Sequence, residues 1–119
     1  MALMTITYGG DFLALHEKSC SACEGFDAPL DDAGMAPFAA ELDPAWTIVD
    51  GHHLERVWEF SDFAEALAFV NSAGAVCEEE WHHADFNFGW GRVQVTIWTH
   101  SVNGLTEADF VLACKLDQL

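Results

Sequence analysis

Three histidines in the C-terminal third of the chain have the residue type and spacing for proton transfer. His82 and His83 are adjacent and follow Trp81, and His100 lies at the far end of an alternating segment that begins at Val93. An unperturbed imidazole has a pKa close to neutrality, so it can both donate and accept a proton at physiological pH. These side chains therefore indicate general acid and base chemistry, provided that the fold brings them together.

The backbone around the adjacent pair decides whether both rings can serve one site. Two neighbouring residues of a regular strand face opposite sides of the sheet, so His82 and His83 can share a site only where the chain turns. We therefore expect an irregular segment there, at the end of a helix. Three imidazoles would also suffice for a catalytic zinc ion. The three histidines form no HExxH motif and no short ligand spacing beyond the adjacent pair, which favours chemistry without a metal.

The other histidines and the tryptophans have structural interpretations. His52 and His53 directly follow the turn signal Asp50-Gly51, which favours a polar hairpin loop, and His16 is interpreted as a surface residue. Asp109 has two open interpretations, as a helix-capping residue and as a carboxylate that orients an imidazole. Burial or an oligomer interface is favoured over ligand stacking for the tryptophans at 46, 58, 81, 90 and 98.

Length and charge limit the classes of function. A chain of 119 residues that is 51% hydrophobic predicts one compact domain. We assign it to residues 19–119, with residues 1–18 as a possible flexible extension. Twenty acidic residues against four Lys and Arg give a formal net charge of −16, which should repel phosphate backbones and anionic lipid headgroups. Direct nucleic-acid binding and membrane binding are therefore not expected.

Cysteine usage and the first residues predict a cytoplasmic protein with reduced thiols. Residues 1–15 lack the features of a secretory signal, and no apolar stretch is long enough to cross a membrane. Cys20 and Cys23 form a CxxC motif, but Cys77 and Cys114 are too far apart to complete a zinc ribbon. We therefore interpret the cysteines as structural thiols, with a metal or redox site as the alternative.

The hydrophobic periodicity predicts an α+β fold. The helical signals are Pro37 as a helix start, a stripe of apolar residues that recur every three or four positions after Ser61 and Asp62, and the capping-box spacing of Thr106 and Asp109. We predict a four-stranded antiparallel sheet with two long helices and one short helix packed on one face. The located segments are helices at 37–42, 62–80 and from 105 onward, and strands at 46–49, 54–60 and 93–98.

In these residues the chain resembles the pterin-4a-carbinolamine dehydratase family. The similarity runs from about Cys20 to the C-terminus, and its motifs are specific only in combination. They are the CxxC motif, Trp46, Leu54-Glu55-Arg56 with Phe60, Asp62-Phe63, Ala66 and Phe69, Glu78 with His82-His83, and Thr99-His100 with Gly104-Leu105-Thr106 and Asp109.

The resemblance implies an activity, a site and partners. The activity is dehydration of 4a-hydroxytetrahydropterin to quinonoid dihydropterin, in pterin recycling for aromatic amino-acid hydroxylases. The family's catalytic histidines correspond to His82, His83 and His100. The positions that surround or support its site correspond to Glu78, Trp46, Thr99 and Asp109. The elimination requires no metal or organic cofactor, and members of the family form homodimers or homotetramers.

One departure from the family leaves a second function open. Ala84 stands where the family usually has proline after the His pair, which should leave this loop less constrained. Relatives with this fold include transcriptional coactivators and Rubisco assembly factors, so the alternative is a binding or assembly protein without catalysis. Retention of all three histidines favours the enzyme.

Overall fold

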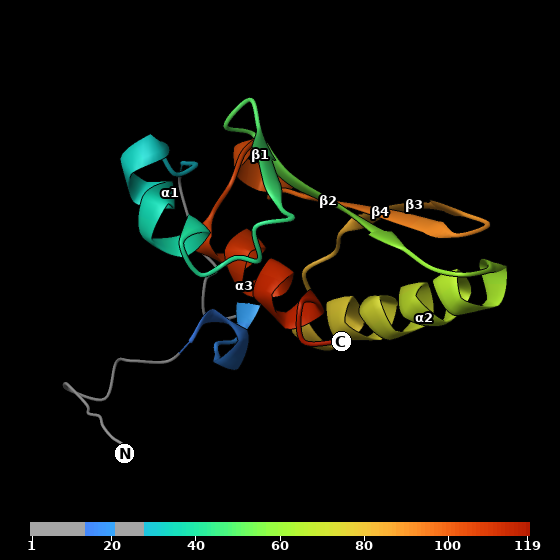
Figure 1. Cartoon of the computed structure of the whole chain (residues 1–119). Helices are drawn as coiled ribbons and strands as arrows, with labels where there is room; N and C mark the ends of the chain where they lie inside the picture. The colour runs from blue at the N-terminus through green and yellow to red at the C-terminus, as the bar shows by residue number, and fades with distance from the viewer. Residues whose placement is uncertain (1–13, 21–27) are drawn as a thin grey trace, which may run out of the picture.

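The computed structural model describes residues 14–20 and 28–119, and Figure 1 shows their arrangement. The described part contains a four-stranded antiparallel sheet and three α-helices, which confirms the α+β prediction. The strands lie in the order β1-β2-β4-β3. The elements are η1 (Leu15–Glu17), α1 (Asp32–Ala39), β1 (Thr47–Val49), β2 (His53–Glu59), α2 (Phe63–Glu80), β3 (Asp85–Gly89), β4 (Arg92–Ile97), η3 (His100–Val102) and α3 (Glu107–Leu116).

The two faces of the sheet differ in polarity. In β4, Val93, Val95 and Ile97 are fully buried, whereas the alternate residues Gln94 and Thr96 are partly exposed on the other face. Helices α2 and α3 lie on the side of the buried residues (Figure 1). The alternation predicted for the segment 93–98 is therefore confirmed. The end of β4 leads into η3, which begins at His100.

Helix α3 is the centre of the core. Phe110, Leu112 and Leu116 have no exposed surface, and η1, α1 and α2 all pack around this helix. The ring of Phe38 in α1 lies with its centroid 5.7 Å from that of Phe110. Thr106 caps the helix, as its spacing to Asp109 predicts. The core therefore fixes the position of Asp109 in the first turn of α3.

Helix α1 begins earlier than predicted. Pro37 lies inside α1 and not at its start, because Asp31 is the N-cap and its side chain accepts a hydrogen bond from Gly34 N–H at 2.8 Å. Proline lacks the N–H that would bond to the residue four positions earlier, and its fixed φ is compatible with a helix.

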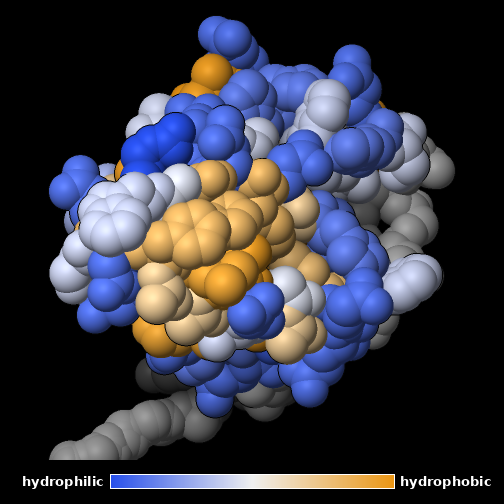
Figure 2. Space-filling view, turned by 90° about the vertical axis from the view of Figure 1, so that its right-hand side faces the viewer, coloured by the Kyte–Doolittle hydropathy of each residue, from blue (hydrophilic) through white to orange (hydrophobic). Residues whose placement is uncertain are grey.

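Helix α2 begins as predicted but leaves part of its apolar stripe exposed. The Asp62 side chain accepts a hydrogen bond from Glu65 N–H at 2.9 Å, and Ala66, Ala73 and Cys77 are buried. Phe63 and Leu67 remain 43% and 39% exposed. Figure 2 shows an apolar area on the side of the molecule where α2 begins and the β3–β4 hairpin turns. Within the described residues, no helix is long and apolar enough to span a membrane.

Candidate active site

His82 and Asp109 form the central contact of the candidate site. The Nε2 atom of His82 lies 2.7 Å from Oδ1 of Asp109. Asp109 has no exposed surface, whereas the His82 side chain is 18% exposed. A carboxylate only accepts hydrogen bonds, so it fixes the imidazole with a proton on Nε2 and leaves Nδ1 for exchange with a substrate. The pair can therefore act as an oriented acid or base that reaches the surface.

The end of α2 directs His82 toward α3. Trp81 adopts the left-handed conformation, with φ of 54° and ψ of 38°, and the N–H groups of Trp81 and His82 both donate to the Cys77 carbonyl. His82, His83 and Ala84 then lie outside regular structure before β3 begins at Asp85. The irregular segment that the sequence predicts at the pair is confirmed.

The left-handed Trp81 leads to a stability prediction. An L-residue with a side chain costs about 1–2 kcal/mol in this conformation, whereas glycine adopts it freely. Trp81 is 73% exposed, so little packing is lost when its side chain is removed. We expect Trp81→Gly to raise the free energy of unfolding by about 1 kcal/mol, measured by urea denaturation. Trp90→Gly is the matched control, because Trp90 is 72% exposed without a positive φ. Equal effects of the two substitutions would contradict this explanation.

Asp109 makes contacts that fit both interpretations left open by the sequence, helix capping and contact with an imidazole. Its Oδ2 atom accepts hydrogen bonds from Thr106 N–H at 2.8 Å and from Thr99 Oγ1 at 2.7 Å. The bond to Thr106 completes the capping box of α3, while Oδ1 remains available for His82. Thr99 Oγ1 also lies 2.9 Å from Thr106 Oγ1. One buried carboxylate thus joins the helix start, the end of β4 and the imidazole.

His83 belongs to a separate and more exposed pair. Its Nε2 atom lies 2.5 Å from Oε2 of Glu78, and the two side chains are 49% and 69% exposed. Glu78 is in the last turn of α2, so the helix supplies the partner that orients this ring. The Trp81 ring lies edge-on to the His83 ring, with centroids 5.3 Å apart. Glu78 therefore contacts the ring of His83 directly.

His100 follows Thr99 directly and begins the 3-10 turn η3. Its ring contacts the Trp98 ring, with centroids 4.5 Å apart. Thr99 and Gly104 close this loop through hydrogen bonds of 2.8 and 3.3 Å between their backbones. A side chain at position 104 would meet Pro29 at 2.6 Å, so only glycine fits. The sequence analysis did not predict the contact between His100 and Trp98. The signal for it was their separation by two residues, because alternate residues of a strand lie on the same face of the sheet.

The structure joins some of the predicted site residues and leaves others apart. His82, Asp109 and Thr99 form one hydrogen-bonded network, and His100 is the next residue after Thr99. His83, the residue after His82, forms a separate pair with Glu78 of α2. No hydrogen bond or ring contact joins His100 to either adjacent histidine within residues 14–20 and 28–119. Likewise, no group of three potential metal ligands occurs in the described part of the chain, and Cys23 lies outside it.

Trp46 lies in a different part of the molecule. Its Nε1–H donates to Oδ1 of Asp117 at 2.8 Å, and its ring lies edge-on to Trp58. Asp117 is eight residues beyond Asp109, which is about 12 Å along a helix. Arg56 also donates to Oδ1 of Asp117, at 2.7 Å. Burial nevertheless raises the pKa of the Asp117 carboxyl, against the opposing effects of these two donors.

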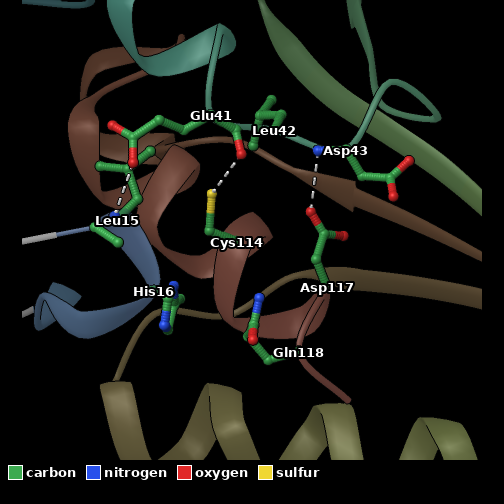
Figure 3. A pocket seen from close by; sticks show the side chains of 9 residues that line it. Leu15, His16, Glu41, Leu42, Asp43, Cys114, Asp117 and Gln118 are labelled. Atoms are coloured by element: carbon green, nitrogen blue, oxygen red, sulfur yellow. Dashed lines mark hydrogen bonds between the residues drawn. The ribbon is translucent and has the colours of Figure 1, made fainter. Parts of the chain in front are cut away.

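Asp117 lines a pocket of about 410 Å³ that the sequence did not predict (Figure 3). Glu41 also lines it, and its backbone carbonyl accepts a hydrogen bond from the Cys114 thiol at 3.7 Å. None of the three predicted catalytic histidines lines this pocket. The residues around it are Ala14, Leu15, His16, Glu41, Leu42, Asp43, Cys114, Asp117 and Gln118.

The Cys114 thiol in this pocket should be unreactive. Burial, together with the charges of Asp117 and Glu41, raises the pKa of Cys114 to about 12. The thiolate is the nucleophile, so we expect iodoacetamide to modify Cys114 at pH 8 about 100-fold more slowly in the native protein than in urea. Mass spectrometry of the labelled peptide measures both rates. Similar rates in the two states would show that the thiol is accessible and ionised in the folded protein.

Burial or an oligomer interface was predicted for the tryptophans, and the structure tests burial within one chain. Trp46 is buried and Trp58 and Trp98 are partly buried, as expected. Trp81 and Trp90 are both more than 70% exposed, so burial within this chain is wrong for these two. Each lies at a chain reversal, Trp81 at the end of α2 and Trp90 between β3 and β4, where the side chain projects away from the core.

The chain thus has an α+β fold in which His82, Asp109 and Thr99 form one hydrogen-bonded network. In this network the buried Asp109 carboxylate contacts the partly buried His82 imidazole. The family model described as pterin 4 alpha carbinolamine dehydratase matches residues 28–119. The chain belongs to this family. A relative from Rubrobacter xylanophilus, provisionally named pterin-4-alpha-carbinolamine dehydratase, is 49% identical over 105 residues, which are 88% of this chain and 97% of that protein. A relative from Alkaliphilus metalliredigens with the same provisional name is 39% identical over 87% of this chain and 94% of that protein.

Two solved structures share the fold. A transcriptional coactivator/pterin dehydratase from Brucella melitensis has a TM-score of 0.69 and 35% identity, and the match covers 76% of this chain and 96% of that one. A pterin dehydratase-like protein identified as a Rubisco assembly factor in the alpha-carboxysome has a TM-score of 0.53 and 25% identity, with coverage of 62% and 87%. The similar structures therefore include one described as a coactivator/pterin dehydratase and one described as an assembly factor.

Proposed function

We propose that this protein dehydrates 4a-hydroxytetrahydropterin to quinonoid dihydropterin, with His82, His83 and His100 as its catalytic side chains. The observation that carries the proposal is the buried Asp109 carboxylate that holds the His82 imidazole at 2.7 Å. A purely structural capping residue needs only one of its carboxylate oxygens, and here the second is used to orient a ring that reaches the surface. Membership of the dehydratase family supplies the substrate class.

The reaction requires an acid and a base. A proton must reach the hydroxyl at C4a, so that the C4a–O bond breaks with loss of water. The proton on N5 must leave, so that its electron pair forms the C=N bond of the quinonoid product. Imidazoles can perform both transfers near neutral pH, and each well-placed transfer contributes about 10²–10⁴ in rate.

His82 and His100 are assigned to the two proton transfers, and His83 to orienting the pterin. Asp109 orients the His82 ring through the 2.7 Å contact, as carboxylates do for imidazoles that cycle protons. The exposed His100 can exchange its proton with water between turnovers. His83, held by Glu78, lies in the same irregular segment as His82 and offers a polar contact to the pterin. Which of His82 and His100 is the acid stays open.

The alternative is an assembly or coactivator protein without catalysis. It is supported by the similar structure identified as a Rubisco assembly factor and by the exposed apolar residues Val57, Phe63 and Leu67. The same residues fit a homodimer or homotetramer, which we propose for the enzyme. Three further expectations stay predictions. They are an aromatic amino-acid hydroxylase as a partner, a role in pterin recycling and a cytoplasmic location.

A stopped-flow assay tests the function. Enzymatically generated 4a-hydroxytetrahydropterin is mixed with the protein, and the appearance of quinonoid dihydropterin is followed by absorbance. We expect the dehydration rate to rise in proportion to protein concentration, above the rate in buffer. No acceleration at any protein concentration would reject the dehydratase and favour the assembly protein.

A further inference from the structure

Trp98 lies between two imidazoles, only one of which belongs to the proposed catalytic set. The centroid of its ring is 4.1 Å from that of His52 and 4.5 Å from that of His100. The Trp98 Nε1–H is buried and has no hydrogen-bond partner within the described residues. An unpaired buried donor is costly, so the ring contacts, and not the N–H, account for the placement of this side chain.

His52 is tied to the turn that carries His100. Its Nε2 atom lies 3.0 Å from Oδ1 of Asn103, the residue that ends η3, and the Asn103 N–H donates to the His100 carbonyl at 3.2 Å. His52 itself comes from the β1–β2 hairpin, where its N–H donates to Val49. The hairpin therefore contacts η3 at both ends, through Trp98 before His100 and through Asn103 after it.

Both ring nitrogens of His52 have hydrogen-bond partners. The Asn103 Oδ1 atom can only accept, so Nε2–H of His52 donates to it at 3.0 Å. The Nδ1 atom of His52 lies 3.1 Å from Nδ1 of His53, and either atom can be the donor. On the far side of His53, its Nε2 atom lies 4.0 Å from a carboxylate oxygen of Glu55. His52 is thus held in one orientation by partners on both nitrogens.

We propose that His52 is a positioning residue for His100, acting through the Trp98 ring and the Asn103 side chain. This role differs from the sequence-based interpretation of His52 as a polar loop residue. The consequence for catalysis rests on the proposed function, because it requires His100 to transfer a proton to or from the pterin. The positioning itself does not depend on the reaction.

Substitutions at position 103 separate this role from folding. Asn103 has a φ of 53°, a conformation that glycine adopts without strain, so Asn103→Gly removes the acceptor for His52 and preserves the turn. Asn103→Asp keeps an oxygen acceptor at the same place and is the matched control. His52→Ala removes both the ring contact and the hydrogen bond.

The first readout is the proton NMR shift of His100 Hε1, which senses the ring current of Trp98. The resonance is assigned by its loss in His100→Ala. In Asn103→Gly and His52→Ala, we expect this shift to move toward that of an exposed histidine with no change in melting temperature, and in Asn103→Asp to stay near the wild-type position. An unchanged His100 shift in both Asn103→Gly and His52→Ala would overturn the proposal.

The second readout is kcat for pterin dehydration. We expect Asn103→Gly and His52→Ala to lower kcat by roughly 10- to 100-fold with a smaller change in KM, and Asn103→Asp to recover most of the loss. Loss of the NMR shift with unchanged kcat would mean that His52 does not position His100 for catalysis. If the wild-type protein itself shows no dehydration, the proposed function fails, and the NMR experiment alone decides whether His52 holds His100.

Discussion

Replacing His82 by glutamine is expected to lower kcat for pterin dehydration by about 10²–10⁴ while the protein stays folded. The glutamine amide can still donate a hydrogen bond to Oδ1 of Asp109, which His82 contacts at 2.7 Å in the structure. It cannot take up and release a proton near neutral pH. His82→Gln therefore removes the proton transfer and retains the partner of the buried carboxylate. Stopped-flow rates give kcat, and circular dichroism checks the fold.

The control for this substitution is His16→Ala. His16 is an exposed residue of η1 and has no side-chain contact with the network of Asp109. Its removal should leave kcat unchanged. If His82→Gln retains wild-type kcat, then the imidazole at this position transfers no proton in the reaction, and the proposed mechanism is wrong. His82→Ala should be as inactive and also less stable, because it leaves Asp109 short of one donor.

Replacing Phe110 by alanine is expected to lower the free energy of unfolding by about 3–5 kcal/mol. The side chain has no exposed surface and is the largest of the fully buried side chains in the described core. Its removal leaves a cavity in α3 next to Phe38, whose ring centroid is 5.7 Å from that of Phe110. Because Asp109 is the neighbouring residue, loosening α3 should also weaken the hydrogen bonds of Asp109 with His82 and Thr99. Urea denaturation followed by tryptophan fluorescence measures the change.

Phe63→Ala is the matched control for the core substitution. Phe63 is 43% exposed and stacks on Phe88, at a centroid distance of 5.6 Å. We expect a loss of about 1–2 kcal/mol from its partial burial and ring contact. Equal losses for the two phenylalanines would mean that α3 is not the centre of the core, or that another copy of the chain covers Phe63.

Local signals explain which parts of the fold could be predicted from the sequence. Helix α2 begins at Asp62, whose side chain accepts from the N–H three residues later, and α3 begins at Thr106, whose N–H donates to the side chain of Asp109 three residues later. The first hairpin turns at Asp50-Gly51, where both residues have positive φ. Four strands were predicted but only three were located. The missing strand, Asp85–Gly89, alternates Phe86 and Phe88 with polar neighbours, but its asparagine and glycine hid the pattern.

The candidate site was only partly predictable because its contacts join distant segments. The family resemblance, and not spacing, brought Asp109 and His82 together across 27 positions of sequence. Spacing could not reveal that Trp46 bonds to Asp117, at the far end of α3 from Asp109. It also could not show that His52 reaches Asn103, which depends on how the first hairpin packs beside η3. Capping and alternation are local, whereas these contacts depend on tertiary packing.

The most direct test of a shared pterin site is a histidine NMR titration with a 7,8-dihydropterin, which lacks the 4a hydroxyl and does not react. We expect the Hε1 resonances of His82, His83 and His100 to shift together along one saturable curve, while that of His16 stays in place. If the analogue binds and the resonance of His100 or His82 does not move, these rings do not surround one bound pterin, and the acid–base assignment is contradicted.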